Sequence, residues 1–451
     1  MKIYPLLLVF AIVLSALTGL SSQSGCLPDG ITFTSQAQID SFPINYPGCT
    51  VIEGEIKING PDISSLEGLS AITSLAGNLK IFNNDVLTSL DGLEGLHVIQ
   101  GDFLLIDNFA LASIDALLGL NYVGGTFWLY RNHALTHLSG LENLITIDDG
   151  LVLGSDSLAD IGALSNLTAI HGGLAIINNG VLENLYGLHN LADFSGSLEI
   201  SENASLKDLS ALASLTSIDF FLFLSENDSL ENLHGLDQLM EINGDLQIRK
   251  NASLSDLSAL KNLAVVKGEL RIEENASLIN LSGLDNVAGI DGPLVVTKNL
   301  LLNSLAGLDQ VDPASIQYMI LTANSKLSIC SVTAVCTFLE NDMGDALISG
   351  NAKGCANQLE VENACQALSA GNQIIDNEIR LFPNPGNGVV QINMPGNAGC
   401  EVSVWDALGQ LVVQSHHLME GRIDLSELPV GLYFLEFNDG QRSITKRIIK
   451  Q

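Results

Sequence analysis

Leucine and isoleucine recur at fixed intervals through most of this chain, and an asparagine recurs among them every 24 residues. Counted from each asparagine, the consensus is NxxLxxLxxLxxLxxIxGxLxIxx, and residues 251–274 are one full copy of it. A fixed period of this length is typical of a solenoid, in which each repeat forms one coil and contacts only its neighbours. We therefore predict a mainly β solenoid of about eleven coils of 24 residues over residues 51–328.

The spacing of apolar residues within one copy predicts its local structure. Leu270 and Ile272 are two residues apart, as in a strand with one buried face. The other apolar positions are three residues apart, which suits tight corners, a second short strand or a helical turn. One coil cannot enclose its own apolar side chains, so stacked coils should bury a continuous ladder of Leu and Ile. Strands of neighbouring coils should then be parallel and about 4.8 Å apart.

The recurring asparagines are expected to face inward and to bond from coil to coil. Asn tolerates the turn conformations that end a strand, and its amide both donates and accepts hydrogen bonds. The step from Asn132 to Asn179 is 47 residues, so we expect Asp156 to fill the missing position and the next coil to be one residue short. The predicted ladder consists of Asn84, Asn108, Asn132, Asp156, Asn179, Asn203, Asn227, Asn251, Asn275 and Asn299.

The side chains between and beyond the two buried strand positions should point outward in two rows. These rows are apolar and aromatic in the first half of the repeats and become polar and charged in the second half. An exposed apolar patch usually marks an interface, and Trp128 and Tyr130 suit stacking on a sugar or a protein hot spot. The alternative is that a cap or a second copy covers this face. The candidate ligand-binding residues are Phe82, Leu104, Ile106, Trp128, Tyr130, Val152 and Ile177.

Segments outside the repeats indicate export. Residues 1–25 have an apolar run that is too short to span a bilayer and is flanked by small residues, which predicts a Sec signal peptide. Six cysteines flank the array, in segments that we expect to cap it at residues 26–50 and 329–366. Disulfides are the first expectation for an exported protein, with zinc as the alternative for the last four. Cys26 and Cys49 should pair, whereas Cys330, Cys336, Cys355 and Cys365 allow three pairings.

The net charge of −32 belongs to the repeats and not to the tail. Residues 27–366 contain 12 Lys/Arg against 42 Asp/Glu, and residues 380–451 contain 6 against 7. Nucleic acids and anionic membrane surfaces bind through Lys/Arg patches, so this balance argues against both as partners. The acidic residues are interpreted as a solvated coat that keeps the protein soluble. No stretch after the signal peptide is long and apolar enough for a membrane helix.

The last part of the chain has a different pattern. After a polar linker at residues 367–379, alternating apolar runs are separated by Gly, Pro and Asn: LFPNPGNGVVQI, VSVWDALGQLV, IDLSELPVGLYFLEF and SITKRIIK. Such runs predict a small antiparallel β-sandwich over residues 380–451. One interpretation of this sandwich is an ordinary adhesion module.

Two resemblances follow from these phrases. The segment LMEINGDLQIRKNASLSDL at residues 239–257 resembles the receptor L-domain. This resemblance implies a right-handed β-helix of leucine-rich-repeat character and a role in ligand binding. The tail resembles the type IX secretion C-terminal sorting domain, type A, which implies export across the outer membrane of a Gram-negative cell, removal of the tail, and release or surface attachment. The residues that match its motif are Pro383, Asn384, Pro385, Gly388, Gly409, Gly431, Tyr433 and Lys446.

No catalytic set is assembled by the sequence. There is no G-x-S-x-G, H-E-x-x-H or Walker motif, and neither an EF-hand nor an RTX calcium loop. His133 and His137 are four residues apart but follow an asparagine turn, which does not favour a shared metal. We expect no cofactor and no metal, and a non-enzymatic protein that binds a glycan or a protein. The alternatives are a structural or adhesive surface component and, less favoured, a β-helical polysaccharide-degrading enzyme.

Overall fold

The computed structural model describes residues 25–367, 380–386, 388–393, 401–406, 410–417, 422–438 and 443–451. The chain divides into two compact units, Met1–Val361 and Glu362–Gln451. Residues 1–24 of the predicted signal peptide, residues 368–379 of the predicted linker, Cys400 and the motif residue Gly409 lie outside the described residues.

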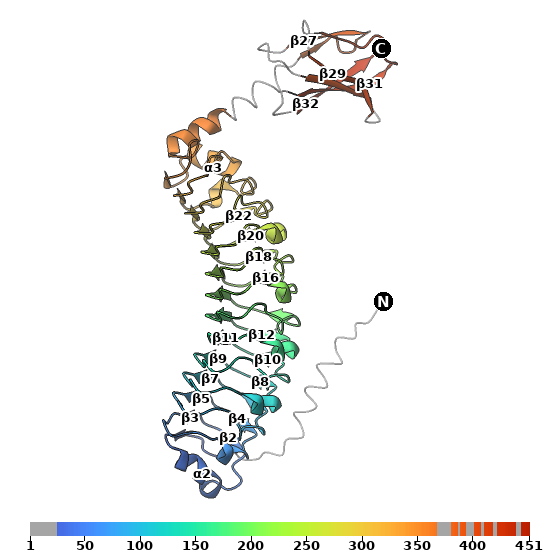
Figure 1. Cartoon of the computed structure of the whole chain (residues 1–451). Coiled ribbons are helices and arrows are strands. Elements are labelled where there is room, and N and C mark those ends of the chain that lie inside the picture. Colours follow the sequence, from blue (N-terminus) through green and yellow to red (C-terminus); the bar gives the residue numbers. More distant parts are fainter. Residues whose placement is uncertain are drawn as a thin grey trace. The chain divides into compact units, whose positions relative to one another are not determined.

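The repeats form a stack of coils whose strands build one long parallel sheet (Figure 1). Consecutive strands pair in register at the repeat spacing, as in Leu246 with Leu270 and Ile248 with Ile272. The sheet has 14 strands, and its first and last come from the two segments expected to be caps. The strands are β1 (Ile31–Phe33), β3 (Ile56–Ile58), β5 (Leu79–Phe82), β7 (Phe103–Ile106), β9 (Phe127–Tyr130), β11 (Leu151–Gly154), β13 (Leu174–Ile177), β15 (Leu198–Ser201), β17 (Leu222–Ser225), β19 (Leu246–Arg249), β21 (Leu270–Glu273), β23 (Leu294–Thr297), β24 (Met319–Thr322) and β25 (Ala346–Ser349).

A second ribbon of two-residue strands runs along the coils and is broken once. Its first part contains β2 (Val51–Ile52), β4 (Ser74–Leu75), β6 (Val98–Ile99), β8 (Tyr122–Val123), β10 (Thr146–Ile147), β12 (Ala169–Ile170) and β14 (Asp193–Phe194). Its second part contains β16 (Ser217–Ile218), β18 (Glu241–Ile242), β20 (Val265–Val266) and β22 (Gly289–Ile290). At the break, Phe194 occupies the position of the fully buried Ile170 and Ile218 but is only partly buried.

The three-residue spacing forms corners, several of which are short 3-10 helices. Because a 3-10 helix has three residues per turn, side chains three apart fall on one face. Leu257 and Leu260 in one such corner are both buried. These helices are η2 (Glu67–Leu69), η3 (Asp115–Gly119), η4 (Gly162–Asn166), η5 (Ser210–Leu212), η6 (Ser258–Asn262) and η7 (Pro313–Ser315).

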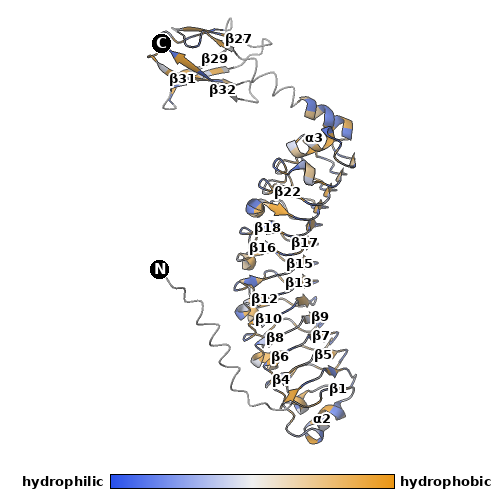
Figure 2. Ribbon diagram, turned by 180° about the vertical axis from the view of Figure 1, so that it is seen from behind, coloured by the Kyte–Doolittle hydropathy of each residue, from blue (hydrophilic) through white to orange (hydrophobic). Residues whose placement is uncertain are grey.

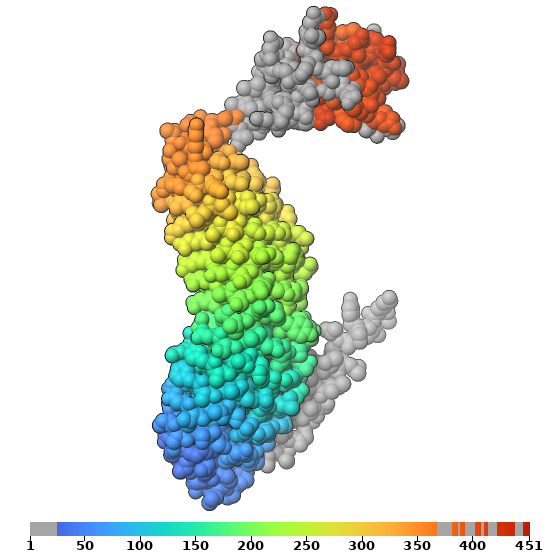
Figure 3. Space-filling model, viewed as in Figure 1, coloured from blue at the N-terminus to red at the C-terminus, as the bar shows by residue number. Residues whose placement is uncertain are grey.

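The interior of the repeat unit is a column of aliphatic side chains. In the copy at residues 251–274, all seven Leu, Ile or Val positions of the consensus are at most 1% exposed. Figure 2 shows the hydropathy of each residue along the coils, and Figure 3 shows the coils as successive layers of colour over the visible face. The core is therefore continuous from coil to coil, as expected for a solenoid.

The asparagine ladder is buried and hydrogen-bonded throughout. The Oδ1 atom of Asn227 accepts from the backbone N–H and the Nδ2 of Asn203, at 3.2 and 3.3 Å. Its own Nδ2 donates to the carbonyl of Ile200 and to Asn251 Oδ1. The same bonds extend the ladder to Asn324 and Asn351, where coil lengths of 25 and 27 residues hid the repeat from sequence comparison.

Asp156 does not occupy the missing position in the ladder, which corrects our expectation. Asp156 is exposed, and the buried Ser155 takes the inward position. The backbone N–H of Ser155 donates to Asn179 Oδ1, and the Ser155 hydroxyl donates to the carbonyl of Asn132. The short coil is therefore the one that ends at Ser155.

The residue missing from this coil has a particular conformation. In the other coils from β5 to β24, the residue before the inward asparagine has a positive φ, such as Arg131 at 56° and Glu226 at 58°. Gly154 at the end of β11 is followed at once by Ser155, so the left-handed residue is the one deleted. A left-handed residue turns the chain by local backbone geometry alone, so its loss shortens the coil without disturbing the core positions.

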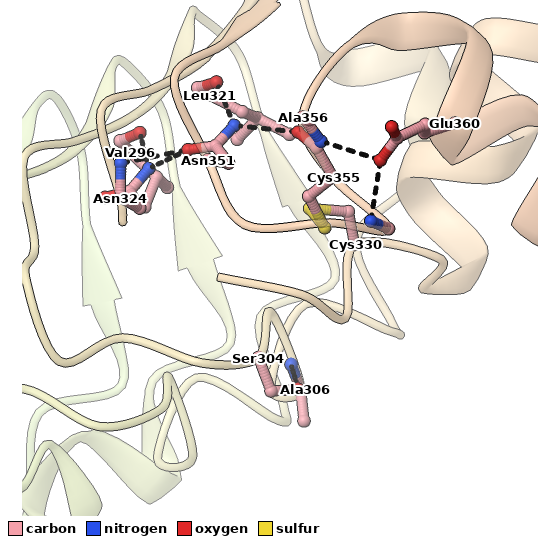
Figure 4. The surroundings of a disulfide bond; sticks show 11 residues. Val296, Ser304, Ala306, Leu321, Asn324, Cys330, Asn351, Cys355, Ala356 and Glu360 are labelled. Carbon is pink, nitrogen blue, oxygen red and sulfur yellow. Dashed lines mark hydrogen bonds between the residues drawn. A yellow bond between two sulfur atoms is a disulfide. The ribbon is translucent and has the colours of Figure 1, made fainter. Parts of the chain in front are cut away.

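The two ends of the stack are closed by helices and disulfides. At the first coil, α2 (Gln36–Asn45) buries Ile39 and Phe42, and Cys26 is bonded to Cys49. At the last coil lies α3 (Thr333–Glu340). Cys330 is bonded to Cys355 beside the last asparagines (Figure 4). Cys336 and Cys365 are disulfide-bonded as well.

The C-terminal unit consists of two small antiparallel sheets that share one core. The first sheet contains β26 (Arg380–Phe382), β27 (Val389–Asn393) and β30 (Arg422–Asp424). The second contains β28 (Glu401–Asp406), β29 (Leu411–His417), β31 (Gly431–Asn438) and β32 (Ser443–Lys450). Val390 and Ile392 from the first sheet pack with Val404, Leu435 and Ile448 from the second.

One of the motif residues of the tail, Asn384, joins its first and last segments. Asn384 donates from Nδ2 to the carbonyl of Arg447 and accepts from the N–H of Ile449. The hydroxyl of Tyr433 donates to the carbonyl of Pro429. Pro383, Pro385 and Gly388 fall in the turn that leads into β27, Gly431 begins β31, and Lys446 lies within β32.

Candidate functional site

The outward face of the long sheet presents two rows of side chains in register. In the first row Leu104, Trp128 and Val152 are paired across β7, β9 and β11. In the second row Phe82 and Ile106 continue to Tyr130. Of the candidate binding residues, Trp128 is 40% exposed, and Phe82, Leu104, Ile106, Tyr130, Val152 and Ile177 are partly buried. All of them lie on this face, which gives an apolar surface from β5 to β13.

An aromatic cluster extends this surface around the end of strand β9. The rings of Trp128 and Tyr130 meet edge to face with centroids 6.4 Å apart. Beyond the strand, the ring of His133 is stacked on Phe109 at 5.5 Å, and the guanidinium of Arg131 lies 5.8 Å from the centre of the Phe109 ring. We call these five residues the aromatic cluster. Trp, Tyr and Arg are the residues most enriched in binding hot spots.

The cluster stands on a rigid support. Phe127 and Leu129, which flank Trp128 in the strand, are fully buried, and the ring of Phe127 is stacked on Phe103 at 4.7 Å. The ring of Tyr130 lies over Gly154, where an added Cβ atom would come within 2.5 Å of the ring. The sequence analysis missed Phe109 and Arg131, although their positions after the strand repeat every 24 residues and could have been compared in the same way.

Charged residues on the same face are paired with each other at both ends of the apolar surface. At the first coils, the Nζ atoms of Lys57 and Lys80 lie 2.7 and 2.6 Å from the carboxylate of Glu55. Burial raises the pKa of Glu55, but the hydrogen bonds from Lys57, Lys80 and Asn78 outweigh it and hold that pKa at about 2. The carboxylate of Glu55 is therefore fully compensated at the first coils.

The later coils carry an ion-pair network. Arg271 contacts Glu269 at 2.5 Å and Glu273 at 3.3 Å, and Arg249 contacts Glu273 at 3.1 Å. The hydrogen bond to Glu269 is the main cause of a raised pKa of Arg271. Along the column of left-handed residues, Lys250 pairs with Glu226 at 2.7 Å and Lys298 with Glu274 at 2.5 Å. These basic groups are thus already engaged by acidic neighbours.

A second polar network lies on the corner between the two ribbons of strands. His171 contacts Asp148 through Nδ1 at 3.0 Å and Asp193 through Nε2 at 3.3 Å, and Tyr122 donates its hydroxyl to Asp148. Burial alone would lower the pKa of His171, but the two carboxylates outweigh it and raise that pKa above 6.5. Burial and the neighbouring Asp148 raise the pKa of Tyr122 to about 12. This network joins four successive coils, those of β8, β10, β12 and β14.

The structure gives no support for metal sites in the part of the chain it describes. Within those residues, no group of three or more His, Cys, Asp or Glu side chains could hold a metal ion. His133 pairs instead with Asp156 at 3.3 Å. A hollow elsewhere on the coils is lined by Asn184, Tyr186, His189 and Asp208, with the rings of Tyr186 and His189 stacked at 4.7 Å. Its polar oxygens Asn184 Oδ1 and Asp208 Oδ1 are already used by turn amides.

Comparisons with known proteins agree with this architecture. Residues 48–117 and 220–339 match the family model Receptor L domain, and residues 380–451 match the Secretion system C-terminal sorting domain. A comparison with curated proteins gave no match. Among the described residues, no helix is long and apolar enough to cross a membrane. The repeats are therefore a receptor L-domain-like solenoid, and the tail is a type IX sorting domain that marks a secreted or cell-surface protein with a binding role.

Proposed function

We propose that this secreted or cell-surface receptor L-domain protein is a non-catalytic recognition protein that binds a glycan or a protein through the outward face of strands β5 to β13. One observation carries the proposal: an aromatic cluster that includes the exposed Trp128 lies on the outward face of an otherwise regular sheet. A solvent-exposed Trp beside Tyr and Arg has the composition of an interface hot spot and not of a surface selected for solubility.

The support beneath this face favours binding. Its outward side chains alternate with buried ones along short strands that are paired on both sides. The conformational entropy of these side chains is therefore lost when the protein folds and not when the partner binds, which raises affinity for a rigid partner. The platform needs no conformational change to present Trp128 and Tyr130.

The regularity of the coils is the reason for proposing a function without catalysis. Coils between Asn84 and Asn299 differ by at most one residue, so few loops protrude that could gather acids into a cleft. Enzymes assemble catalytic groups in concave sites that exclude water, whereas this face is an open sheet.

The test is a double variant, Trp128→Ala with Tyr130→Ala, assayed on immobilised glycan and protein arrays. We expect the array signal of the full chain to disappear while stability changes by about 1 kcal/mol or less, because both rings lie outside the core. Tyr186→Ala is the matched control, because Tyr186 is an exposed aromatic residue away from this face. It should retain the signal.

Two results would count against the proposal. An unchanged array signal in the double variant would remove the strand face from binding. Loss of the folded state, detected by circular dichroism, would mean that the two rings are structural. Absence of any array signal from the native chain would favour the alternative of a structural or adhesive surface component.

A further inference from the structure

We infer that the partner of this face is a polypeptide segment that presents apolar side chains together with Lys or Arg. The inference rests on the proposed function and adds the chemical class of the partner. It follows from the charges around the aromatic cluster and from the hydrogen-bonding capacity of the apolar surface.

The coils that follow the aromatic cluster have an uncompensated negative charge. Residues 132–206 contain nine Asp or Glu and not one Lys or Arg. On the outward face itself, Glu199 lies in the same row as Trp128, three strands further along, and Glu202 occupies the left-handed position after the same strand. Within the described part of the chain, no Lys or Arg side chain forms an ion pair with either carboxylate.

This differs from the rest of the same face. Lys57 and Lys80 neutralise Glu55 on one side, and Arg249 and Arg271 engage Glu273 on the other. Within the aromatic cluster Arg131 also pairs with Asp107, at 3.2 Å. Among the described residues, the acids of this face that no Lys or Arg engages are therefore Glu199 and Glu202, three strands beyond Trp128. Open carboxylates on the same face as exposed aromatic rings are complementary to a cation, which the rings also attract.

The apolar part of the surface decides between a glycan and a polypeptide. The outward side chains on β11 and β13 are Val152, Gly154, Ala175 and Ile177, and none of them can donate or accept a hydrogen bond. A glycan laid across these strands would bury hydroxyl groups without partners, which costs free energy. Apolar side chains of a polypeptide would instead gain from burial there.

The geometry sets the length of the segment. Trp128 and Glu199 are three strand spacings apart, which is about 14 Å at about 4.8 Å per strand. An extended segment of about five residues spans this distance. A second copy of the chain is not favoured as the partner, because it would bring the same excess of carboxylates to the contact.

The experiment reads binding at Trp128 itself. The chain contains two tryptophans, Trp128 and Trp405. Trp405 lies in β28 of the C-terminal unit, so the variant Trp405→Phe of the full chain leaves Trp128 as its single tryptophan. The probes are pools of random ten-residue peptides built from Leu and Lys, from Leu and Glu, or from Ser and Lys, together with a neutral glucan and a chitosan oligomer. Fluorescence is titrated at physiological salt.

We expect the Leu/Lys pool to shift the fluorescence of Trp128 and to bind about tenfold more tightly than the Ser/Lys pool, with no response to the Leu/Glu pool. Glu199→Gln combined with Glu202→Gln should weaken the Leu/Lys pool about tenfold. Glu231→Gln, an exposed acid outside the strand face, is the control for net charge and should have little effect.

A second pair of variants separates charge from bulk. Position 175 is in the row that holds Lys80 and Glu199, so a long side chain of either sign fits there. Ala175→Lys should weaken binding of the Leu/Lys pool much more than Ala175→Glu does. Equal binding of the Leu/Lys and Leu/Glu pools, or equal effects of the two variants at position 175, would overturn the inference.

The remaining outcomes distinguish this inference from the proposed function. A fluorescence response to the glucan or to chitosan, without a response to the Leu/Lys pool, would overturn the polypeptide partner and leave the strand face as a glycan-binding surface. A lack of response to every probe would count against both.

Discussion

Removing one amide from the middle of the asparagine ladder should destabilise the solenoid by a predictable amount. In Asn227→Leu, the volume of the side chain is roughly kept and its hydrogen bonds are lost. The backbone N–H of Asn203 then loses Asn227 Oδ1, its acceptor at 3.2 Å, in a position that water cannot reach. Asn203 Nδ2 keeps its bonds to Ile176 and Ser201, so one donor is fully stranded.

The expected cost is about 1–3 kcal/mol, which is the usual range for a buried donor left without a partner. The carbonyl of Ile200 also loses the Nδ2 donor at 2.9 Å, which places the result in the upper part of that range. A new apolar side chain regains part of this free energy only if it packs, and the neighbouring amides give it polar surroundings.

Urea unfolding followed by circular dichroism measures the change, and hydrogen exchange resolved to the coil at residues 198–222 reports it locally. Local measurement matters because long repeat arrays do not always unfold in one step. Asn286→Leu is the control: Asn286 is exposed and makes one hydrogen bond, to the carbonyl of Lys261. It should change stability by no more than about 0.5 kcal/mol. Equal midpoints for the two variants would refute a stabilising role of the inward ladder.

Two further predictions concern the polar network and the first coil. Because the folded state raises the pKa of His171, its stabilising contribution is complete below about 6.5 and declines as pH rises through the raised value. The difference in urea midpoint between the native chain and His171→Asn should therefore be larger at pH 6 than at pH 9, and the opposite trend would contradict the network. Replacing Cys26 and Cys49 together by Ser should cost about 3 kcal/mol on the chain-entropy estimate for a loop of this size. The loss should appear as faster exchange in residues 26–58, and unchanged exchange there would show that α2 alone holds the first coil.

The mistaken position of Asp156 shows what periodicity can and cannot give. The pattern showed that one residue is missing between Asn132 and Asn179, but it assigned the short coil to the one after Asp156, whereas the short coil ends at Ser155. It could not say which residue was deleted, since an acid and a serine can both fill a polar position. The choice of Ser155 depends on the loss of the left-handed residue after Gly154, which is a property of backbone conformation.

The residues of the candidate site were likewise predicted only in part. Strand alternation placed Trp128 and Tyr130 in one outward patch, because side chains two apart share a face. The contributions of Phe109, Arg131 and His133 depend on how the chain turns after the strand, and no alternation rule covers those positions. The ladder beyond Asn299 was missed for a related reason: coil lengths of 25 and 27 residues break the fixed count while the hydrogen bonds continue.

What the sequence determined by itself was the repeat, the stacking direction of the strands, the buried positions and the character of the tail. The first three follow from regular spacing, because a side chain's phase along the coil decides whether it faces the core, and the character of the tail follows from its motif phrases. What only the tertiary structure decided was the partner of each side chain across coils. Arg271 is neutralised by Glu269 and Glu273, while no Lys or Arg in the described part of the chain pairs with Glu199. Pairing of this kind depends on the three-dimensional position of charged tips at the ends of flexible side chains, which no one-dimensional period records.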